Sequence, residues 1–400
     1  MTTAVIVDAI RTGGGKCNGD LSGWHPADLA AEVLKALVER NNLDPALVDD
    51  VIMGCVMQVG GQALNVGRNA VLAAGFPESV PATTIDRQCG SSQQSAHFAA
   101  QGVMAGAYDI AIAAGVEVMS LVPMGASVGD IKRTGFPFGD QVGLRYADQG
   151  GLVPQGISAE MIADQWDISR EELDAFGAES QRRAAQAQAE GRFDNEIVAV
   201  QKKRRDKETG NVVVLDELHT SDEGIRPDTS AESLANLKPA FKPDGKVTAG
   251  NSSQICDGAS AALIMSEEKA KELGLTPRAR FHTFALAGVD PVTMLTGPIP
   301  STQKAIARSG GLTLDDIDLF EVNEAFASVV LAWAKETGAD LAKTNVNGGA
   351  IALGHPLGGS GTKLLATLLN ELERTGGRYG LQTMCEGGGQ ANATIIERLG

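Results

Sequence analysis

The stretch LDPALVDDV at residues 43–51 has a counterpart in LTLDDIDLF at residues 312–320. Each follows an apolar helical pattern and runs into a short apolar segment that is typical of a buried strand. A second pair, GAYDIA at residues 106–111 and GGRYGL at residues 376–381, recurs at almost the same offset in the same setting. The repeat therefore predicts two copies of one α/β unit, one in each half of the chain.

Length and composition agree with a duplicated α/β chain. The sequence has 400 residues, too many for one compact core, and 48 of them are glycine while only 4% are aromatic. Short apolar runs alternate with helical patterns, as expected for buried strands flanked by helices. We assign residues 1–120 and 250–271 to an N-terminal half and residues 272–400 to a C-terminal half.

The composition changes between the halves, over residues 121–249, which we interpret as an inserted loop or lid domain. A long helix is expected to begin at Ser169, where Glu172 completes a capping box, and to stop at Gly191. The basic run KKRRDK at residues 202–207 is more typical of a solvated loop than of a binding patch.

The charge balance excludes some function classes. The formal net charge is −16, from 50 acidic and 34 basic residues, so the overall field repels phosphate backbones and no nucleic-acid partner is expected. No apolar run reaches the about 18 residues that span a bilayer, and no secretory signal is visible. We therefore expect no membrane span and a cytoplasmic protein.

Five cysteines stand at positions 17, 55, 89, 256 and 385, without a CxxC pair. This spacing fits neither a disulfide framework nor a zinc site, and no metal site is predicted. Cys17, Cys55 and Cys256 are interpreted as packing residues, because free cysteine is among the most buried residue types. Cys89 and Cys385 lie in surroundings that suggest chemistry.

Cys89 lies in the segment IDRQCGSS at residues 85–92, between a strand expected over 82–85 and a helix expected over 91–104. At the start of a helix, the dipole and the free N–H groups favour a thiolate. The same N–H groups can stabilise an acyl oxyanion. Cys89 is therefore a candidate nucleophile, and the alternative is a cysteine packed at a strand–helix junction.

His355 lies in NGGAIALGHPLGGSG at residues 347–361, which holds six glycines and one histidine. Such a glycine density marks a place where the backbone closely approaches another group. No phosphate-binding or dinucleotide motif matches the segment. A single histidine is more often structural, but the glycine-rich turn before a helix expected over 362–374 favours a catalytic role.

Two further segments place polar groups at strand ends. MCEGGG at residues 384–389 follows an apolar strand expected over 380–383, and it is expected to expose the Cys385 thiol and backbone N–H groups. EVNEAFA at residues 321–327 lies where a strand passes into a helix. Glu324 in this segment is a candidate general base, and the alternative is a glutamate that simply starts a helix.

Together these segments resemble the thiolase family over essentially the full length of the chain. They are the cysteine segment around residue 89, Asn-Glu-Ala-Phe at 323–326, Gly-His-Pro at 354–356 and the cysteine–glycine segment at 385–389. The four motifs in this order are very specific. The resemblance implies two βαβαβαββ halves stacked as a five-layered α/β/α/β/α sandwich, with the loop domain over the active site.

The resemblance also implies a role for each matching residue. Cys89 would accept an acyl group as a thioester, and His355 would take its proton. His355 and a water bound by Asn323 would later help to hold the thioester oxyanion of the second substrate. Cys385 would add or remove the α-proton of acetyl-CoA. The backbone N–H groups of Cys89 and Gly387 would form the second oxyanion hole.

For coenzyme A, the segment VTAGNSS at residues 247–253 resembles the pantetheine-contacting loop of the family, with Ser253 at the contacting position. Arg226 matches a residue that faces the nucleotide end of CoA. CoA and acyl-CoA are therefore expected as substrates, with no permanently bound cofactor. The resemblance further implies a homodimer or a homotetramer.

Departures from the family pattern bear on the substrate. Short-chain biosynthetic thiolases tend to carry His-Met-Gly where this chain has PQG at residues 154–156, which is closer to degradative 3-oxoacyl-CoA thiolases. The segment DRQ at residues 86–88 is similar to actinobacterial acyl- and steroid-type members. Gly13 stands where the family usually has proline. We therefore predict a degradative 3-oxoacyl-CoA thiolase of fatty-acid or steroid side-chain β-oxidation.

Two alternatives accompany this prediction. Within the same class, the chain is an acetoacetyl-CoA thiolase. In a different class, it is an inactive thiolase-like scaffold or lipid-binding protein. Loss of Cys89, His355 or Cys385 would mark the inactive protein, and the sequence keeps all three.

Overall fold

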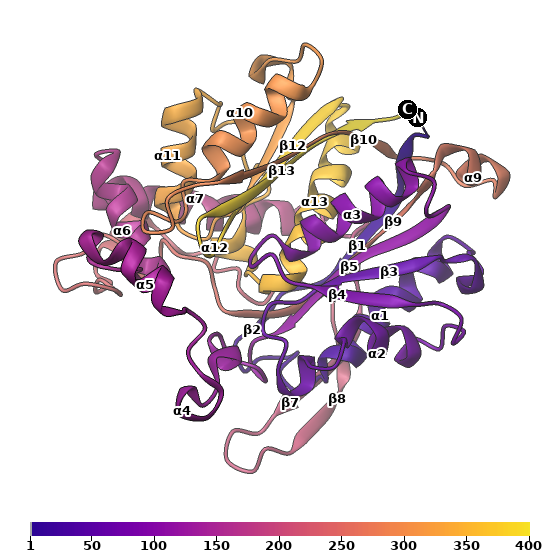
Figure 1. The fold of residues 1–400 in the computed structure, drawn as a ribbon, viewed down its shortest axis with the longest axis horizontal. Helices are drawn as coiled ribbons and strands as arrows, with labels where there is room; N and C mark the ends of the chain where they lie inside the picture. The colour runs from indigo at the N-terminus through magenta and orange to yellow at the C-terminus, as the bar shows by residue number, and fades with distance from the viewer. Residues whose placement is uncertain (1) are drawn as a thin grey trace.

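The computed structural model describes residues 2–400 (Figure 1). In chain order the N-terminal half contains β1 (Ala4–Thr12), α1 (Pro26–Arg40), β3 (Asp50–Gly54), α2 (Val66–Ala73), β4 (Ala82–Ile85), α3 (Ser91–Met104), β5 (Ile110–Val118) and β9 (Cys256–Ser266). The strands follow the spatial order β1-β9-β5-β3-β4, and β9 pairs antiparallel with both β1 and β5. This succession is the expected βαβαβαββ unit.

The C-terminal half repeats this succession with one difference. It contains β10 (Ala279–Gly288), α10 (Pro298–Arg308), β11 (Leu319–Val322), α11 (Ala327–Thr337), α12 (Ala350–Leu353), α13 (Ser360–Thr375), β12 (Tyr379–Glu386) and β13 (Gln390–Arg398). The strand expected between α11 and α13 is reduced to a single bridge between Phe320 and Thr344. The chain turns away immediately afterwards, because Asn345 and Gly348 have φ angles of 47° and 75°.

The two halves stack as five layers (Figure 1). Helices α1 and α2 pack against one face of the N-terminal sheet, and α10 and α11 pack against one face of the C-terminal sheet. Between the sheets lie α3 and α13, whose apolar side chains join β1, β5 and β9 to β11 and β13 in one core cluster. The predicted α/β/α/β/α sandwich is therefore confirmed.

The central helix α13 is deeply enclosed in this sandwich. All of its residues from Ser360 to Leu372 are buried. The two sheets also meet at one edge, where β1 pairs antiparallel with β10 through Val5 and Ile6. The start of α13, directly after the segment of His355, is thus rigidly held. Within residues 2–400, no helix is both long and apolar enough to cross a bilayer.

The chain between β5 and β9 forms the insertion. It contains α4 (Ile131–Thr134), α5 (Asp140–Tyr146), α6 (Gln155–Gln165), α7 (Arg170–Ala189), β6 (Ile197–Val198), β7 (Val200–Arg205), β8 (Val212–His219) and α8 (Ala231–Ala235). The predicted long helix is α7, and Ser169 and Glu172 form its capping box.

The basic run at residues 202–207 is not the loop that we expected. Most of it lies in β7, which pairs with β8 in a hairpin that projects from the body (Figure 1). Lys202 and Arg204 form ion pairs with Asp20 of the N-terminal half, at 3.5 and 2.5 Å. Neutralisation by Asp20 and pairing with an apolar strand allow this basic segment to be extended.

Candidate active site

Cys89 lies in a turn between β4 and α3 that has an uncommon conformation. Gln88 has a φ of 48°, in the left-handed region that residues other than glycine rarely adopt. The Asp86 carboxylate accepts the Gln88 N–H at 2.6 Å and helps to hold the turn. Gly90 then caps α3, and Cys89 is 5% exposed. The structure therefore places Cys89 at the predicted strand–helix junction.

Cys385 lies next to this turn, near the end of β12. The strand runs on to Glu386 instead of stopping at residue 383, so Cys385 is paired with Ala391 of β13. The thiol is fully buried and not exposed as we expected. Gly90 makes the close approach of the two segments possible, because a side chain there would collide with the Glu386 carboxyl.

The two thiols share an environment that disfavours negative charge. Burial raises the pKa of Cys89 to about 12, and the Glu386 carboxyl adds to the rise. Two backbone N–H groups, of Cys89 itself and of Gly387, face the sulfur and oppose the rise. Burial also raises the pKa of Cys385, and Cys89 is close enough to add to it. Both groups are therefore neutral thiols at rest, and Cys89 needs a base.

His355 is oriented by Ser360 at the start of α13. Its Nδ1 lies 2.5 Å from the Ser360 Oγ, and the same hydroxyl lies 3.0 Å from the Pro356 carbonyl. We assign the hydroxyl proton to the carbonyl, because a carbonyl oxygen can only accept. Nδ1 therefore carries the imidazole proton, and Nε2 is unprotonated. Burial, with the positive charge of Lys363, lowers the pKa of His355 to about 3. The neutral imidazole is ready to accept a proton at Nε2.

Asn323 joins His355 to Cys385. It follows β11 directly and is 1% exposed. Its Nδ2 lies 3.5 Å from His355 Nε2. Burial raises the pKa of Cys385, and the Asn323 side chain opposes this by a hydrogen bond to the sulfur. The structure thus brings together Cys89, His355, Asn323, Cys385 and Gly387, which come from separate segments of the chain.

Glu324 links separate segments of the chain through hydrogen bonds. Its buried carboxyl accepts hydrogen bonds from Ser180 Oγ at 2.6 Å, Asn345 Nδ2 at 3.0 Å and the Ile351 N–H at 3.1 Å. Ser180 belongs to α7 of the insertion, and Ile351 lies in the first turn of α12. Glu324 therefore connects the insertion to the segment before His355, and these contacts argue against a general base.

The residues expected to bind CoA lie on two segments. The Ser253 N–H donates to the Ala325 carbonyl at 3.0 Å, and the carbonyl of Gln254 accepts the His355 N–H at 3.1 Å. Backbone hydrogen bonds thus hold the loop around Ser253 against both the Asn323 segment and the His355 segment. Arg226 lies on the surface of the insertion, with its side chain exposed.

Two residues at the site, Gln155 and Ser360, are not among the predicted catalytic or CoA-binding residues. Gln155 belongs to the PQG segment, which the sequence pattern relates only to the choice of substrate. A Cβ built at Gly387 would lie 3.4 Å from Gln155 Nε2 and 3.0 Å from Gln88 Oε1. Since Gln155 begins α6, the insertion reaches the edge of the active site. For Ser360 the only signal is a hydroxyl group within the glycine-rich segment of His355.

Of the remaining cysteines, two are packed as predicted. Cys55 is fully buried, and Cys256 is 2% exposed and fills the space beside Gly354. Cys17 is exposed, so its interpretation as a packing residue is wrong. It lies in the turn after β2 (Gly15–Lys16), at the surface of the N-terminal half.

Asp20, His219 and Glu223 form a cluster outside this site, with ligand atoms within 4.8 Å of one another. Asp20 already forms ion pairs with Arg204 at 2.5 Å and Lys202 at 3.5 Å. The two cations balance the two carboxylates, so little negative charge is left to hold a metal ion. The cluster is better described as an ion-pair network between the hairpin and the N-terminal half.

Gly13, which stands where the family usually has proline, packs against the same region. A side chain at this position would collide with the Ser221 carbonyl, and its Cβ would lie 2.9 Å from His219 Nε2. The glycine therefore allows the loop after β1 to approach the insertion closely.

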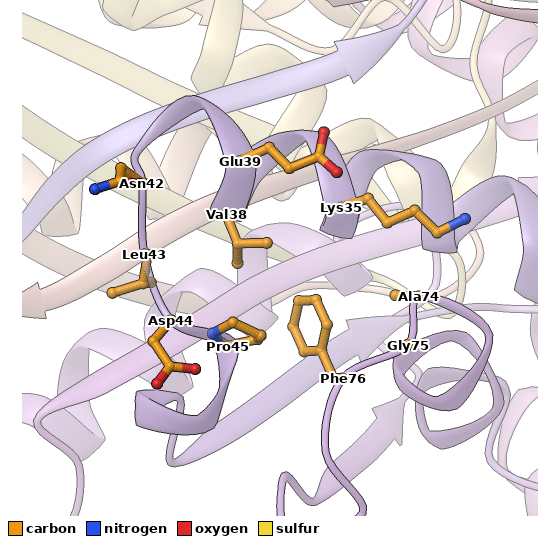
Figure 2. A pocket seen from close by; sticks show the side chains of 10 residues that line it. All are labelled: Lys35, Val38, Glu39, Asn42, Leu43, Asp44, Pro45, Ala74, Gly75 and Phe76. Carbon is orange, nitrogen blue, oxygen red and sulfur yellow. The ribbon is translucent and has the colours of Figure 1, made fainter.

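A surface cavity of about 620 Å³ lies between the end of α1 and the turn after α2 (Figure 2). Val38, Pro45 and Phe76 give it an apolar floor, and Lys35 and Glu39 stand at its rim. None of its lining residues carries a thiol, an imidazole or a hydroxyl group. The cavity therefore offers none of the groups on which the cysteine site depends, and it shares no residue with that site.

Comparison with known proteins agrees with this geometry. Residues 4–268 match the thiolase N-terminal domain, and residues 275–398 match the thiolase C-terminal domain. Steroid 3-ketoacyl-CoA thiolase FadA6 of Mycobacterium tuberculosis is 51% identical over 403 aligned positions, covering 100% of this chain and 95% of that protein. A 3-ketoacyl-CoA thiolase of Aliivibrio salmonicida is 47% identical over 404 positions, covering 100% of both.

The solved structures include the same fold. The crystal structure of the Bacillus anthracis acetyl-CoA acetyltransferase aligns with a TM-score of 0.88 at 40% identity, covering 100% of this chain and 99% of that one. The two domain matches together span almost the whole chain and confirm the resemblance drawn from the four motifs. The chain belongs to the thiolase family of acyltransferases.

Proposed function

We propose that the protein is a 3-oxoacyl-CoA thiolase. It cleaves 3-oxoacyl-CoA with CoA, and the products are acetyl-CoA and an acyl-CoA that is two carbons shorter. The observation that carries the proposal is the convergence on Cys89. Its sulfur faces the N–H groups of Cys89 and Gly387, lies close to Cys385, and shares the site with the His355–Asn323 pair.

The first half-reaction transfers the acyl group to the enzyme. Nε2 of His355 takes the Cys89 proton, and the thiolate attacks the 3-oxo carbon. The N–H groups of Cys89 and Gly387 stabilise the oxyanion that forms there, an effect worth several kcal/mol in related chemistry. The bond between C2 and C3 then breaks, and the thioester oxyanion of the acetyl-CoA enolate is held by His355 and a water bound to Asn323. Cys385 donates its proton to the enolate carbon.

The second half-reaction releases the shortened chain. The first half leaves a thiolate on Cys385, which can take the proton of the incoming CoA thiol. The CoA sulfur attacks the acyl-Cys89 carbonyl, whose oxyanion is again stabilised by the N–H groups of Cys89 and Gly387. Cys89 departs as a thiolate and recovers its proton from His355, so all protons balance.

For CoA itself, we propose the two sites expected from the family. Ser253 contacts the pantetheine arm, which fits its position on a loop fastened to the His355 segment. Arg226 faces the phosphates of the nucleotide end, for which an exposed guanidinium is suited. Residues 121–249 then act as the domain that covers the site, and Gln155 is its nearest contact to Gly387.

An acetoacetyl-CoA thiolase is the second candidate. The solved relative from Bacillus anthracis is titled an acetyl-CoA acetyltransferase and is 40% identical. The relatives named 3-ketoacyl-CoA thiolase are more similar, at 47% and 51%. This difference, together with PQG at residues 154–156, favours longer or bulkier acyl groups. The inactive scaffold is disfavoured, because the reactive side chains are present and converge.

The experiment is a CoA-dependent assay of 3-oxoacyl-CoA cleavage, followed by the loss of substrate absorbance. Short, medium, long and ring-bearing acyl chains are compared at equal concentration. We expect the highest kcat/KM with longer or ring-bearing chains. Activity confined to acetoacetyl-CoA would establish the second candidate instead, and no cleavage of any substrate by folded protein would rule out both.

A further inference from the structure

A small internal cavity lies beside the segment that carries His355. Its volume is about 10 Å³, which accommodates about one water molecule. The polar side chains on its lining belong to Glu321, Asn323, Ser360, Lys363 and Thr367. All five residues are buried, with exposed fractions between 1% and 4%. None of the catalytic steps above uses Glu321 or Lys363.

Two oxygens on this lining have no hydrogen-bond partner within residues 2–400. They are Glu321 Oε2 and Asn323 Oδ1, and both are inaccessible to solvent. A buried polar atom left without a partner costs about 1–3 kcal/mol. Proteins usually satisfy such atoms with ordered water, which marks this cavity as a polar water site.

The neighbouring groups have hydrogen-bonding capacity left over. Lys363 Nζ donates to two carbonyls of the segment just before His355, at 2.6 and 3.0 Å, which leaves one of its three protons free. Ser360 Oγ bonds His355 Nδ1 and one backbone carbonyl, which leaves one lone pair. With a neutral Glu321, these groups offer two donors, on Glu321 and Lys363, and two acceptors, on Ser360 and Asn323, which matches the two lone pairs and two protons of one water.

We infer that the cavity holds one buried water, and that Glu321 is a positioning residue that acts through this water. The water holds Ser360 Oγ against the imidazole and keeps the Asn323 amide turned with Nδ2 toward His355. Glu321 touches neither the substrate nor the reacting atoms. This inference rests on the proposed thiolase function, because it assigns Glu321 a part in orienting the catalytic pair.

Glu321 acts here as a neutral carboxyl. The charged groups around it are Glu196, Glu324, Glu371 and Lys363. Burial raises the pKa of Glu321 well above its usual value, the three glutamates add to the rise, and Lys363 opposes it. The neutral form supplies the proton that the water accepts. A carboxylate in the same place would instead draw a proton onto the nearby imidazole.

Three variants separate this role from a loss of stability. Glu321→Gln keeps a neutral hydrogen-bonding group, Glu321→Leu removes it, and Glu371→Leu removes another buried carboxyl of the same cluster. Glu371 bonds Asn347 and Arg374 and does not line the cavity. We expect Glu321→Leu to lower kcat by up to about 100-fold, as misplacement of a catalytic group by a remote change can do, with KM for CoA unchanged. Glu321→Gln and Glu371→Leu should keep most of kcat.

The pH profile of kcat separates a neutral from a charged Glu321. Since the Glu321 carboxyl carries no charge, Glu321→Gln should not shift the pH profile of kcat. If Glu321→Gln loses as much activity as Glu321→Leu, or shifts the profile, the inference is overturned.

A high-resolution crystal structure of the unmodified protein tests the water without any activity. We expect ordered density at about 3 Å from Glu321 Oε2 and Asn323 Oδ1. A cavity without such density would overturn the inference. Because this result does not depend on turnover, it remains informative even if the proposed function fails.

Discussion

At the scale of single residues, the site contrasts two thiols that are both neutral at rest. Burial raises the pKa of each, to about 12 for Cys89. Cys89 has N–H groups directed at its sulfur and shares its site with a neutral histidine, so it can become a nucleophile when substrate arrives. Cys385 has the amide of Asn323 as a hydrogen-bond partner, which suits a group that exchanges a proton with a carbon acid.

Replacing Cys385 should separate the two half-reactions. In Cys385→Ala, Cys89 and His355 remain in place, so acylation by an acyl-CoA should proceed at close to the normal rate. Claisen condensation should fall by about 100- to 10,000-fold, because no group is left to take the α-proton. Mass spectrometry of the acyl-enzyme measures the first, and a coupled condensation assay measures the second. Condensation at the normal rate would show that another group is the base.

A second histidine, His97, should make the free energy of unfolding depend on pH. His97 of α3 is fully buried, and its Nε2 lies 2.6 Å from Thr394 Oγ1. Burial, with the charge of Arg87, lowers the pKa of His97 from 6.5 to about 3. The unfolded chain therefore binds a proton between these pH values that the folded chain does not. Stability from His97 is complete above pH 6.5 and is lost as pH falls toward 3.

His97→Gln removes this titration. The free energy of unfolding of the normal protein should fall more steeply below pH 6 than that of the variant, by up to about 1.4 kcal/mol per pH unit. Urea unfolding at a series of pH values measures both slopes, and taking the difference cancels the other titrating groups. Equal slopes would mean that His97 is not held neutral in the folded protein.

At the scale of elements, catalysis depends on how closely α3 and α13 pack in the central layer. Cys89 precedes one helix and His355 precedes the other, so the spacing of the helices sets the spacing of the two groups. Gly361 of α13 touches the first turn of α3, where a Cβ would lie 2.7 Å from Gln93 Cα. The contact leaves no room for a methyl group.

Gly361→Ala should therefore destabilise the protein by about 1–3 kcal/mol, as overpacked core sites do. It should also lower kcat, because the helices must separate. Gly143→Ala is the matched control, since Gly143 of α5 has open space around its Cβ position. The control should leave activity intact and be neutral or slightly stabilising in thermal unfolding. Equal behaviour of the two variants would contradict the close packing described here.

At the scale of the whole molecule, most of the fold but only part of the site can be predicted from the sequence. The repeat around residues 43–51 and 312–320 predicts the duplicated unit, because it joins two periodic patterns at fixed spacing. It cannot show that the bridge at Thr344 replaces a strand, since this depends on a local turn at Asn345. Motifs find the reactive cysteines and His355, but Ser360 and Glu321 emerge only once side chains from distant segments are placed.

The insertion contributes the exposed end of the proposed CoA site. Arg226→Ala removes a charge proposed to face the nucleotide phosphates, so KM for CoA should rise by about three- to tenfold while kcat stays unchanged. Arg145→Ala, on α5, is the control, because Arg145 is exposed on the same insertion and has no proposed contact with CoA. An unchanged KM for Arg226→Ala, or an equal rise for both variants, would reject this placement.

The central claim is that Cys89 carries the acyl group. The most direct measurement mixes the protein with a long-chain 3-oxoacyl-CoA without free CoA, quenches the mixture in acid, and maps the modified peptide by mass spectrometry. We expect a thioester on Cys89 whose chain is two carbons shorter than the substrate, discharged when CoA is added and absent in Cys89→Ala. An adduct on another residue, or one that persists in Cys89→Ala, would contradict the account.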